Sequence, residues 1–507
     1  MFAKIRILQL GSEDWRLKYQ LPDNVDFSFE EKLNDEQLNK ELKKPYDLVF
    51  LDKRISKKEL SYLQKATKAY TLFVTDHVNV NGETKQLFDL KKGQRIAESE
   101  IQEFLLYEVR NYFPEPYGEK FQFSNLAIAQ DFSGSIRWDG NYSVVLQGEF
   151  GEELTQIAFW RNNIPVFQGQ AIELWLEYKK DPGVEIALSV TQFVSGSLSE
   201  IQQTWDFSEK ELDDIVLLDN QMAQGVIFVS LQAKGEGTLE IIALHDRYSR
   251  RGHGCFLPGG ERYVTQNREE VFVYFDPGDR KPPLNVYFSG YKTKEGFEGY
   301  RAMRNLGCPF LLISEARLEG GGFYMGSEEY EKLIKDVLRK YMDELGFSGD
   351  QVILSGLSMG TYGALYYGCD IMPHAMILGK PLASIGDVAA NEKLFRPGVF
   401  PTSLDVLHML YGDTDHVAVK ALNDRFWDKF DGADWSRSKF IVAYMIEDDY
   451  DATAYKTLIS HLWSGGVQLY GKGIHGRHND DTGAIVSWFF SQYRKVLHED
   501  FSRKVKN

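Results

Sequence analysis

The segment 352–365 carries the strongest chemical signal in the chain. An apolar run leads into Gly356-Leu357-Ser358-Met359-Gly360, and small residues follow in a helical pattern. Glycine two positions before and two after a serine allows a strand to turn sharply into a helix, which exposes the serine hydroxyl above a sheet. A bare Gly-x-Ser-x-Gly arises by chance in a chain of this length, but a strand before it and a helix after it make it specific. We therefore predict Ser358 as the nucleophile of an acyl-transfer reaction.

Candidates for the acid and the base follow this serine, in the chain order that the fold requires. The apolar run 440–446 ends in Glu447-Asp448-Asp449-Tyr450-Asp451, and any of these carboxylates could orient a histidine. Asp448 is the first choice and Glu447 the second, because they come directly after the strand end, and the remaining acids are expected to be helix-cap or solvated groups. A later loop carries His475 and His478, of which we prefer His478 because it lies nearer the following helix. The segment between acid and base is long enough for a helical crossover, which takes roughly 30 residues.

Two backbone N–H groups are expected to stabilise the oxyanion of the reaction. The first belongs to Met359, the residue after the nucleophile. The second is expected after a predicted strand at 284–288, on Gly290 or Tyr291. A glycine loop at 320–322 follows another predicted strand and either borders the pocket or is a plain flexible turn.

Strand–helix alternation surrounds these residues from about residue 251 to 507, which predicts an α/β-hydrolase-type catalytic domain. An insertion at about 380–435, which includes 395–401, interrupts the alternation, and we predict that it forms a lid over the acceptor site. The run 413–416 within it resembles metal ligands, but a turn with a helix cap is the favoured interpretation. We expect no metal site and no bound cofactor.

A small α/β unit is predicted over residues 1–115. Apolar strand-like runs at 5–10, 48–52 and 70–76 alternate with helical spacing at 59–69 and 98–111, in a Rossmann-like order. No glycine-rich phosphate fingerprint follows the first run, so we interpret the unit as a scaffold and not as a nucleotide-binding domain.

A β-sandwich that binds carbohydrate or a partner is predicted over residues 116–250. Short β-type runs with turn residues between them recur from about 121 to 243. Trp160, Trp175 and Trp205 could stack on sugar rings, but core packing is the favoured interpretation for each.

The composition excludes several classes of protein. A net charge of −16 argues against nucleic-acid binding, because phosphate neutralisation needs clustered Lys and Arg. Three widely spaced cysteines suit a reducing compartment. The first residues lack the apolar core of a signal peptide, and no run is long enough to span a membrane. We expect a cytoplasmic protein that is at most peripherally associated with a membrane.

Taken together, the domain order and three motifs resemble a known family. The motifs are Gly-Leu-Ser-Met-Gly-Thr-Tyr-Gly-Ala at 356–364, Met-Ile-Glu-Asp-Asp-Tyr-Asp at 445–451 and Gly-Ile-His-Gly-Arg-His-Asn-Asp at 473–480. Over essentially the whole chain, the sequence is similar to the family of the second accessory secretory protein of the accessory Sec system, which works in the cytoplasm of Gram-positive bacteria.

The resemblance implies an O-acetyltransferase that acetylates N-acetylglucosamine on serine-rich repeat glycoprotein adhesins during their export. Ser358 and His478 match the nucleophile and base of the family, and its acid falls on Glu447 or Asp448. The implied partners are the first and third accessory Sec proteins, the accessory motor ATPase and the translocon. The acetyl donor stays open, with acetyl-CoA as one candidate. Two alternatives are a carbohydrate esterase or deacetylase with the same triad, and a non-enzymatic export scaffold.

Overall fold

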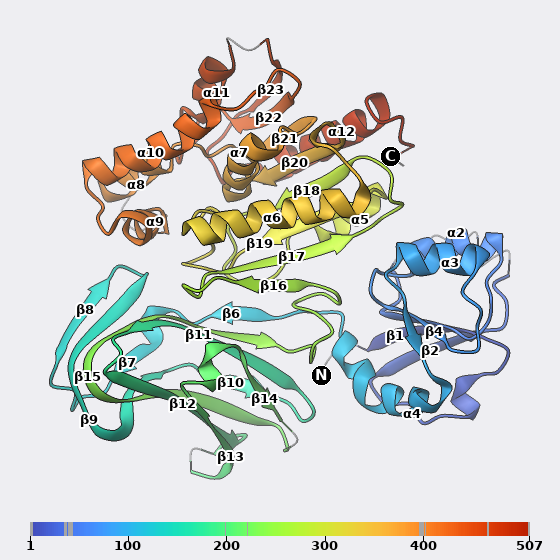
Figure 1. The fold of residues 1–507 in the computed structure, drawn as a ribbon, viewed down its shortest axis with the longest axis horizontal. Coiled ribbons are helices and arrows are strands. Elements are labelled where there is room, and N and C mark those ends of the chain that lie inside the picture. Colours follow the sequence, from blue (N-terminus) through green and yellow to red (C-terminus); the bar gives the residue numbers. More distant parts are fainter. Residues whose placement is uncertain are drawn as a thin grey trace.

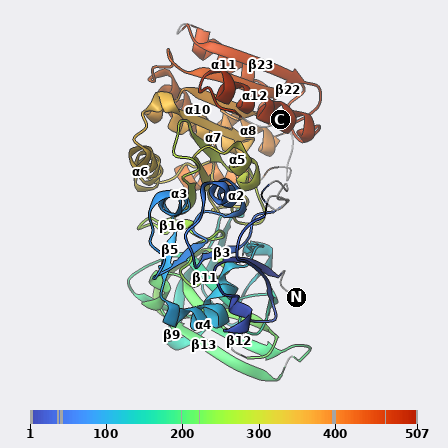
Figure 2. The same cartoon turned by 90° about the vertical axis from the view of Figure 1, so that its right-hand side faces the viewer.

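The computed structural model describes residues 4–34, 38, 44–197, 199–220, 222–394, 400, 402–463 and 466–504. They form a mixed α/β protein with three sheets that occupy successive parts of the chain (Figure 1). Figure 2 shows the eight-stranded sheet at one end, the ten-stranded sheet at the other, and the N-terminal unit facing the viewer. The predicted domain boundaries at 115 and 250 remain a sequence prediction.

The N-terminal unit is a five-stranded parallel sheet in the order β2-β1-β3-β4-β5. Its strands are β1 (Ile5–Leu10), β2 (Val25–Glu30), β3 (Leu48–Leu51), β4 (Leu72–Thr75) and β5 (Gln94–Ile96), with helices α2 (Lys57–Ala66) and α3 (Gly82–Leu90). The three strands predicted from apolar runs are the buried central ones. The segment predicted as one helix at 98–111 consists of short turns of different helix types, of which α4 (Ile101–Glu103) is the α-helical one.

The middle part of the chain is a ten-stranded sheet that closes over one apolar core. Its strands are β6 (Gly118–Lys120), β7 (Leu126–Ile128), β8 (Ser135–Asp139), β9 (Ser143–Trp160), β10 (Ile164–Val166), β11 (Ala171–Lys180), β12 (Val184–Val194), β13 (Ile201–Ser208), β14 (Val216–Asp219) and β15 (Gly225–Tyr248). Trp160 and Trp175 are buried and Trp205 packs against the core, as favoured over sugar stacking.

Two of these strands are much longer than the short strands that the sequence predicts. β9 has 18 residues and β15 has 24, because glycines that resemble turn residues lie within them as bulges. Gly235, with φ +94°, sits where the register between β9 and β15 shifts, and an added side-chain carbon would lie 2.0 Å from the carbonyl oxygen of Gly183. Glycine in a strand therefore bends the sheet here and does not end it.

The C-terminal part is built on an eight-stranded sheet in the order β16-β17-β19-β18-β20-β21-β22-β23. Its strands are β16 (Glu261–Val264), β17 (Glu270–Asp276), β18 (Leu284–Phe288), β19 (Phe310–Ser314), β20 (Val352–Leu357), β21 (Ala375–Gly379), β22 (Lys439–Met445) and β23 (Gln468–Ile474). β18 to β23 are mutually parallel, whereas β16 and β17 are joined antiparallel. The carboxyl ends of the parallel strands therefore meet at one edge of the sheet.

Helices cover this sheet on both faces, as strand–helix alternation requires. They are α5 (Tyr300–Leu306), α6 (Glu328–Leu345), α7 (Met359–Ile371), α11 (Ala454–Leu462) and α12 (Thr482–Glu499), with α8 (Ile385–Leu394), α9 (Thr402–Tyr411) and α10 (His416–Asp431) in the insertion (Figure 1). The side chains of α6, α7 and α10 share one core with the strands, and those of α12 contribute to another. Among the described residues, no helix combines the length and apolar character that a bilayer crossing needs.

Candidate active site

Ser358 lies at the junction of β20 and α7 in a backbone conformation that side chains rarely adopt, with φ 52° and ψ −122°. The turn is so tight that an added side-chain carbon on Gly356 would lie 2.3 Å from the backbone of Gly360. One on Gly360 would lie 2.1 Å from the carbonyl oxygen of Phe288. Both glycines are thus sterically required, which explains the Gly-x-Ser-x-Gly pattern.

Ser358, His478 and Asp448 form a hydrogen-bonded chain at the carboxyl edge of the sheet. The Oγ of Ser358 lies 2.8 Å from Nε2 of His478, and Nδ1 of His478 lies 2.9 Å from Oδ2 of Asp448. The side chain of His478 is 1% exposed and that of Asp448 is 6% exposed. This is the geometry in which a histidine takes the proton of a serine while a carboxylate holds the imidazole in place.

The environment of Asp448 keeps its side chain ionised. Burial alone would raise the pKa of this carboxyl group, but the hydrogen bond from His478 and those from the backbone N–H groups of Tyr450 and Asp451 outweigh it. The pKa of Asp448 is therefore lowered from its usual range. A charged carboxylate stabilises an imidazolium, which is the form that a histidine base takes during acyl transfer.

The neighbouring carboxylate, Glu447, belongs to a different pair. It accepts hydrogen bonds from the N–H of Gly476, at 2.6 Å, and from His475, at 3.0 Å. The Gly476 N–H and then His475 lower its pKa. The side chain of His475 is 86% exposed and that of Glu447 is 53% exposed. The structure thus distinguishes the two carboxylates and the two histidines that the sequence left as alternatives: the buried pair contacts Ser358, and the exposed pair does not.

The two predicted oxyanion donors after β18 differ in what they bind. The N–H of Gly290 donates to the carboxylate of Glu298 at 2.8 Å, so it is already occupied and the prediction for this residue is corrected. The N–H of Tyr291 makes no hydrogen bond within the part of the chain that the structure describes. Met359 is the first residue of α7, where a helix leaves its N–H groups without intrahelical acceptors. Met359 and Tyr291 are therefore the candidates that the geometry leaves.

The glycine loop at 320–322 borders the site. An added side-chain carbon on Gly321 would lie 2.5 Å from the methyl carbon of Met359, and one on Gly320 would lie 2.3 Å from the ring of Tyr291. The buried carboxylate of Glu315 fixes the loop, because it accepts the N–H of Gly322 at 2.8 Å. The loop is a wall of the site and not a free turn.

The insertion reaches the site through Phe400. Its ring lies 5.6 Å from that of Tyr291 and 5.3 Å from that of Tyr450, which in turn lies 4.5 Å from the His478 ring. Most of the motif that predicted a lid, 395–399 and 401, lies outside the described residues. At the predicted turn, Asp415 caps α10 by accepting the N–H groups of the next turn, so the cap interpretation is confirmed there.

Two further acids of this loop, which the sequence analysis interpreted as helix-cap or solvated groups, have specific partners in the structure. Asp449 accepts the backbone N–H of His478 at 3.0 Å, which fixes the segment that carries the base. Asp451 is buried and accepts the N–H groups of Ala383 and Ser384, both at 2.9 Å, at the start of the insertion. The sequence signal that could have identified these roles is the length of the acidic run, because it directly follows a buried strand at the edge where the site forms.

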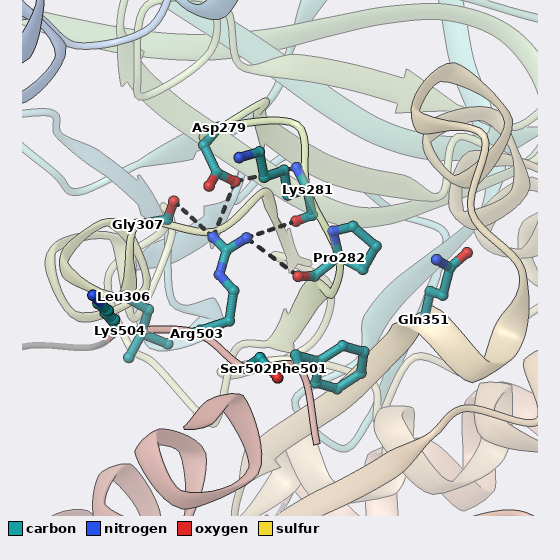
Figure 3. A pocket seen from close by; sticks show the side chains of 10 residues that line it. All are labelled: Asp279, Lys281, Pro282, Leu306, Gly307, Gln351, Phe501, Ser502, Arg503 and Lys504. Carbon is teal, nitrogen blue, oxygen red and sulfur yellow. Dashed lines mark hydrogen bonds and ion pairs between the residues drawn. The ribbon is translucent and has the colours of Figure 1, made fainter. Parts of the chain in front are cut away.

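A cavity of about 610 Å³ lies elsewhere, beside the C-terminal segment (Figure 3). Gln351 and Pro282, which line it, lie just before the amino ends of β20 and β18. Ligands of open α/β sheets bind outside the carboxyl ends of the strands, at the opposite edge. Arg503 in this cavity is already bonded to Asp279 and to backbone carbonyl groups, so the cavity is no alternative active site.

The sequence matches known proteins along nearly its whole length. The family model described as the accessory Sec system GspB-transporter matches residues 5–503. The chain belongs to this family. An accessory Sec system protein of Streptococcus gordonii is 39% identical over 511 residues, which cover 99% of this chain and 100% of that protein. Its counterpart from Staphylococcus aureus is 36% identical over 513 residues, which cover 99% and 98%.

A solved structure supports the family assignment at the level of the fold. A chain of the glycosylation-associated protein (Gap123) complex from Streptococcus agalactiae superposes with a TM-score of 0.87. It is 37% identical, and the match covers 99% of this chain and 100% of that chain. The family predicted from the three sequence motifs is thus confirmed, and the similarity in fold extends over the full length of the chain.

Proposed function

We propose that this member of the family is an O-acetyltransferase that works through an acyl-Ser358 intermediate. Its acceptor is N-acetylglucosamine on a serine-rich repeat glycoprotein adhesin, and acetylation accompanies export by the accessory Sec system. The observation that carries the proposal is the buried chain from Ser358 through His478 to Asp448, with distances of 2.8 and 2.9 Å. A scaffold would have no need to keep this chain together with a strained serine.

The reaction follows from the contacts of each group. His478 takes the hydroxyl proton of Ser358, whose oxygen attacks the carbonyl carbon of the donor. The N–H groups of Met359 and Tyr291 stabilise the oxyanion. The C–O or C–S bond to the donor breaks, and the leaving group receives the proton from His478.

The second half of the reaction transfers the acetyl group. His478 now takes the proton of a sugar hydroxyl, which attacks the acyl carbon and releases Ser358 with its proton restored. Acetyl-CoA is one candidate for the donor, whose leaving group would be a thiol. Water in place of the sugar would make the same site an esterase or deacetylase.

Two properties of relatives support the biological setting that we propose. The Streptococcus agalactiae chain is part of a complex, which supports assembly of this protein with the first and third accessory Sec proteins. The curated relatives are named as accessory Sec system proteins, which supports a role in that system. Within it, we place this protein in the cytoplasm at the membrane, beside the accessory motor ATPase and translocon.

The test compares adhesin glycans from cells that carry wild-type protein or Ser358→Ala. Mass spectrometry should show loss of the mass of one acetyl group per modified sugar in the variant, with the protein still folded. A gain of acetyl groups would instead support deacetylation. Unchanged glycans would contradict both acetylation and deacetylation and would support the non-enzymatic export scaffold. Secreted adhesin measured in the same cells shows whether export depends on the chemistry; we expect much of it to persist.

A further inference from the structure

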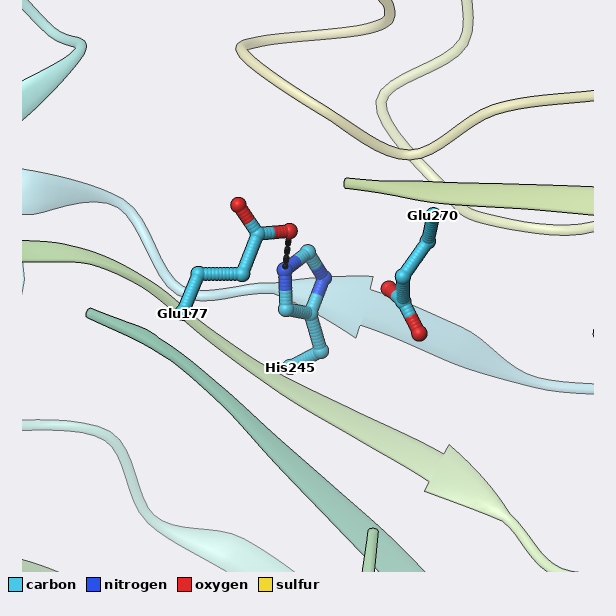
Figure 4. Close-up of side chains that lie close together, drawn as sticks. All are labelled: Glu177, His245 and Glu270. Atoms are coloured by element: carbon cyan, nitrogen blue, oxygen red, sulfur yellow. Dashed lines mark hydrogen bonds and ion pairs between the residues drawn. The ribbon is translucent and has the colours of Figure 1, made fainter. Parts of the chain in front are cut away.

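A buried ionic network joins the ten-stranded sheet to the loop that follows β18. Figure 4 shows Glu177 of β11, His245 of β15 and Glu270 of β17 at its centre. His245 pairs with Glu177 at 3.1 Å and with Glu295 at 2.5 Å. Arg247 donates two hydrogen bonds to Glu270, at 2.8 and 2.6 Å, and also pairs with Glu295. None of these five side chains is more than 8% exposed.

The network resembles a metal site in its residue types, but its hydrogen bonds exclude one. Each ring nitrogen of His245 faces a carboxylate, and the pKa of His245 is raised to about 9, so at neutral pH both nitrogens are protonated and neither offers a lone pair to a metal. The two oxygens of Glu270 are bound by Arg247 and Arg262. The network as a whole is charge-balanced, as buried charges require. Its carboxylates are Glu177, Glu270 and Glu295, and its cations are His245, Arg247 and Arg262.

One member of the network lies in the loop that carries the candidate oxyanion donor. Glu295 follows Tyr291 by four residues, and its own N–H donates to the carbonyl oxygen of Gly118 in β6 at 2.8 Å. Between them, the N–H of Lys292 donates to Gly320 at 3.3 Å, in the glycine loop of the site. The loop thus runs from the active site to the ten-stranded sheet and is attached at both ends.

We propose that Glu295, held by His245 and Arg247, is a positioning residue that sets the place of the Tyr291 N–H relative to Ser358. The inference rests on the proposed function and deepens it. A donor is effective only where the oxyanion forms, and displacement by a fraction of an ångström weakens it. Because His245 and Arg247 of β15 bind Glu295, these two side chains of the ten-stranded sheet position a group of the active site, whereas Glu177 does not contact Glu295.

The charge of His245 makes the attachment sensitive to pH. Groups from every neighbouring element face it: Glu177 from β11, Glu295 from the loop, Glu270 from β17, Lys120 from β6, and Arg247 with Asp246 from β15 itself. Burial would lower the pKa of His245, but the carboxylates of Glu295 and Glu177 raise it to about 9. Above that pH, His245 is neutral and has a single N–H for two carboxylates. Its bond to Glu295 therefore weakens.

The test uses two variants of the full-length chain that each remove one carboxylate from His245. Glu295→Gln acts in the loop, whereas Glu177→Gln lies outside it and serves as the matched control. With p-nitrophenyl acetate as substrate, we expect kcat to fall at least tenfold in Glu295→Gln, with KM within about twofold, since loss of an oxyanion donor costs about 10²–10³ in kcat. In Glu177→Gln, we expect kcat to stay within about threefold. The wild-type kcat should also fall as pH rises through about 9.

The outcomes distinguish the inference from the function. Equal loss of kcat in both variants would show a merely structural network and overturn the inference, as would no loss in either. Absence of turnover in the wild-type protein would overturn the proposed function, and the inference with it. Should Glu295→Gln not fold, Arg247→Lys keeps the charge of the network but shortens the reach to Glu295, and it must lower kcat in the same way.

Discussion

Two buried histidines of this protein have carboxylate partners but serve different ends. His478 has one carboxylate, on Nδ1, and its Nε2 is left for Ser358. His245 has a carboxylate on each ring nitrogen, and nothing is left for a substrate. Burial is the same in both regions, so it is the number of carboxylates that decides the role. One partner orients a base, and two partners keep the imidazole cationic at neutral pH.

The largest effect is expected where the single carboxylate of His478 is changed. Asp448→Asn keeps the size of the side chain but selects the wrong tautomer of the imidazole, and a fall in kcat of about 10⁴ is expected. Steady-state turnover of an acetyl ester measures it, with circular dichroism to show an unchanged fold. If Asp448→Asn kept full activity, the acid would lie elsewhere and the comparison of the two histidines would fail.

A substitution that breaks the network around His245 should lower the stability of the folded protein. Arg247→Met leaves Glu270 and Glu295 buried with less counter-charge, and breaking a buried ion pair costs about 3–5 kcal/mol. The free energy of unfolding from urea titration measures this loss. A change below about 1 kcal/mol would mean that water reaches the network, against the burial described above.

The stability of the folded protein should also depend on pH through His245. The folded pKa of about 9 exceeds the ordinary value of 6.5, so its contribution is fully present below pH 6.5 and is lost as pH rises through 9. On the order of 3–4 kcal/mol is at stake, since one pKa unit corresponds to about 1.4 kcal/mol. Unfolding measured from pH 6 to 10 should show a decline that is smaller in His245→Gln, above all between pH 8 and 10. An equal decline in both proteins would assign it to other groups.

Asp246, next to His245 on β15, sharpens the contrast, because no described residue binds its Oδ1. Burial first, and then the carboxylates of Glu295 and Glu119, raise its pKa to about 8. The unfolded chain ionises at lower pH, so stability falls as pH rises from about 4 to 8. Asp246→Asn should therefore stabilise the protein at pH 7, by up to about 4 kcal/mol. Thermal unfolding would contradict this if the variant melted at or below the wild-type temperature.

The smallest effect is expected at the exposed pair beside the site. Glu447→Gln removes the partner of His475, and exposed ion pairs of this kind contribute little to stability. Activity and stability should both stay near the wild-type values, with kcat within about twofold. The same ester assay, run in parallel with Asp448→Asn, gives the most direct contrast between adjacent carboxylates. A large loss in Glu447→Gln would mean that the exposed loop segment also positions His478.

The parts of the site that the sequence predicted are those with local signals. Gly356 and Gly360 are dictated by the turn at Ser358, and the acid and base follow strands whose apolar runs are readable. The choice between Asp448 and Glu447 was not readable, because adjacent residues share the strand end and only the burial of each side chain distinguishes them.

Other features had no local signal. Glu177, His245, Glu270 and Glu295 lie far apart in the chain and follow no motif spacing, so nothing marked them as one cluster. The occupation of the Gly290 N–H by Glu298 depends on a loop conformation that composition does not dictate. Gly235 resembles a turn residue, but pairing with neighbouring strands on both sides keeps β15 continuous through it. Tertiary pairing thus overrides the local preference.

The attachment of Glu295 to β15 has a consequence for biosynthesis. A ribosome releases the ten-stranded sheet, including His245 and Arg247, before it releases the loop that carries Glu295. Domains generally fold as units in the order in which they emerge, at about 5–20 residues per second. The loop that carries Glu295 can therefore dock onto the ten-stranded sheet, which has already formed, before Ser358 has left the ribosome. The order of synthesis thus matches the order of assembly, and Ser358 is added to a sheet and a loop that have already formed.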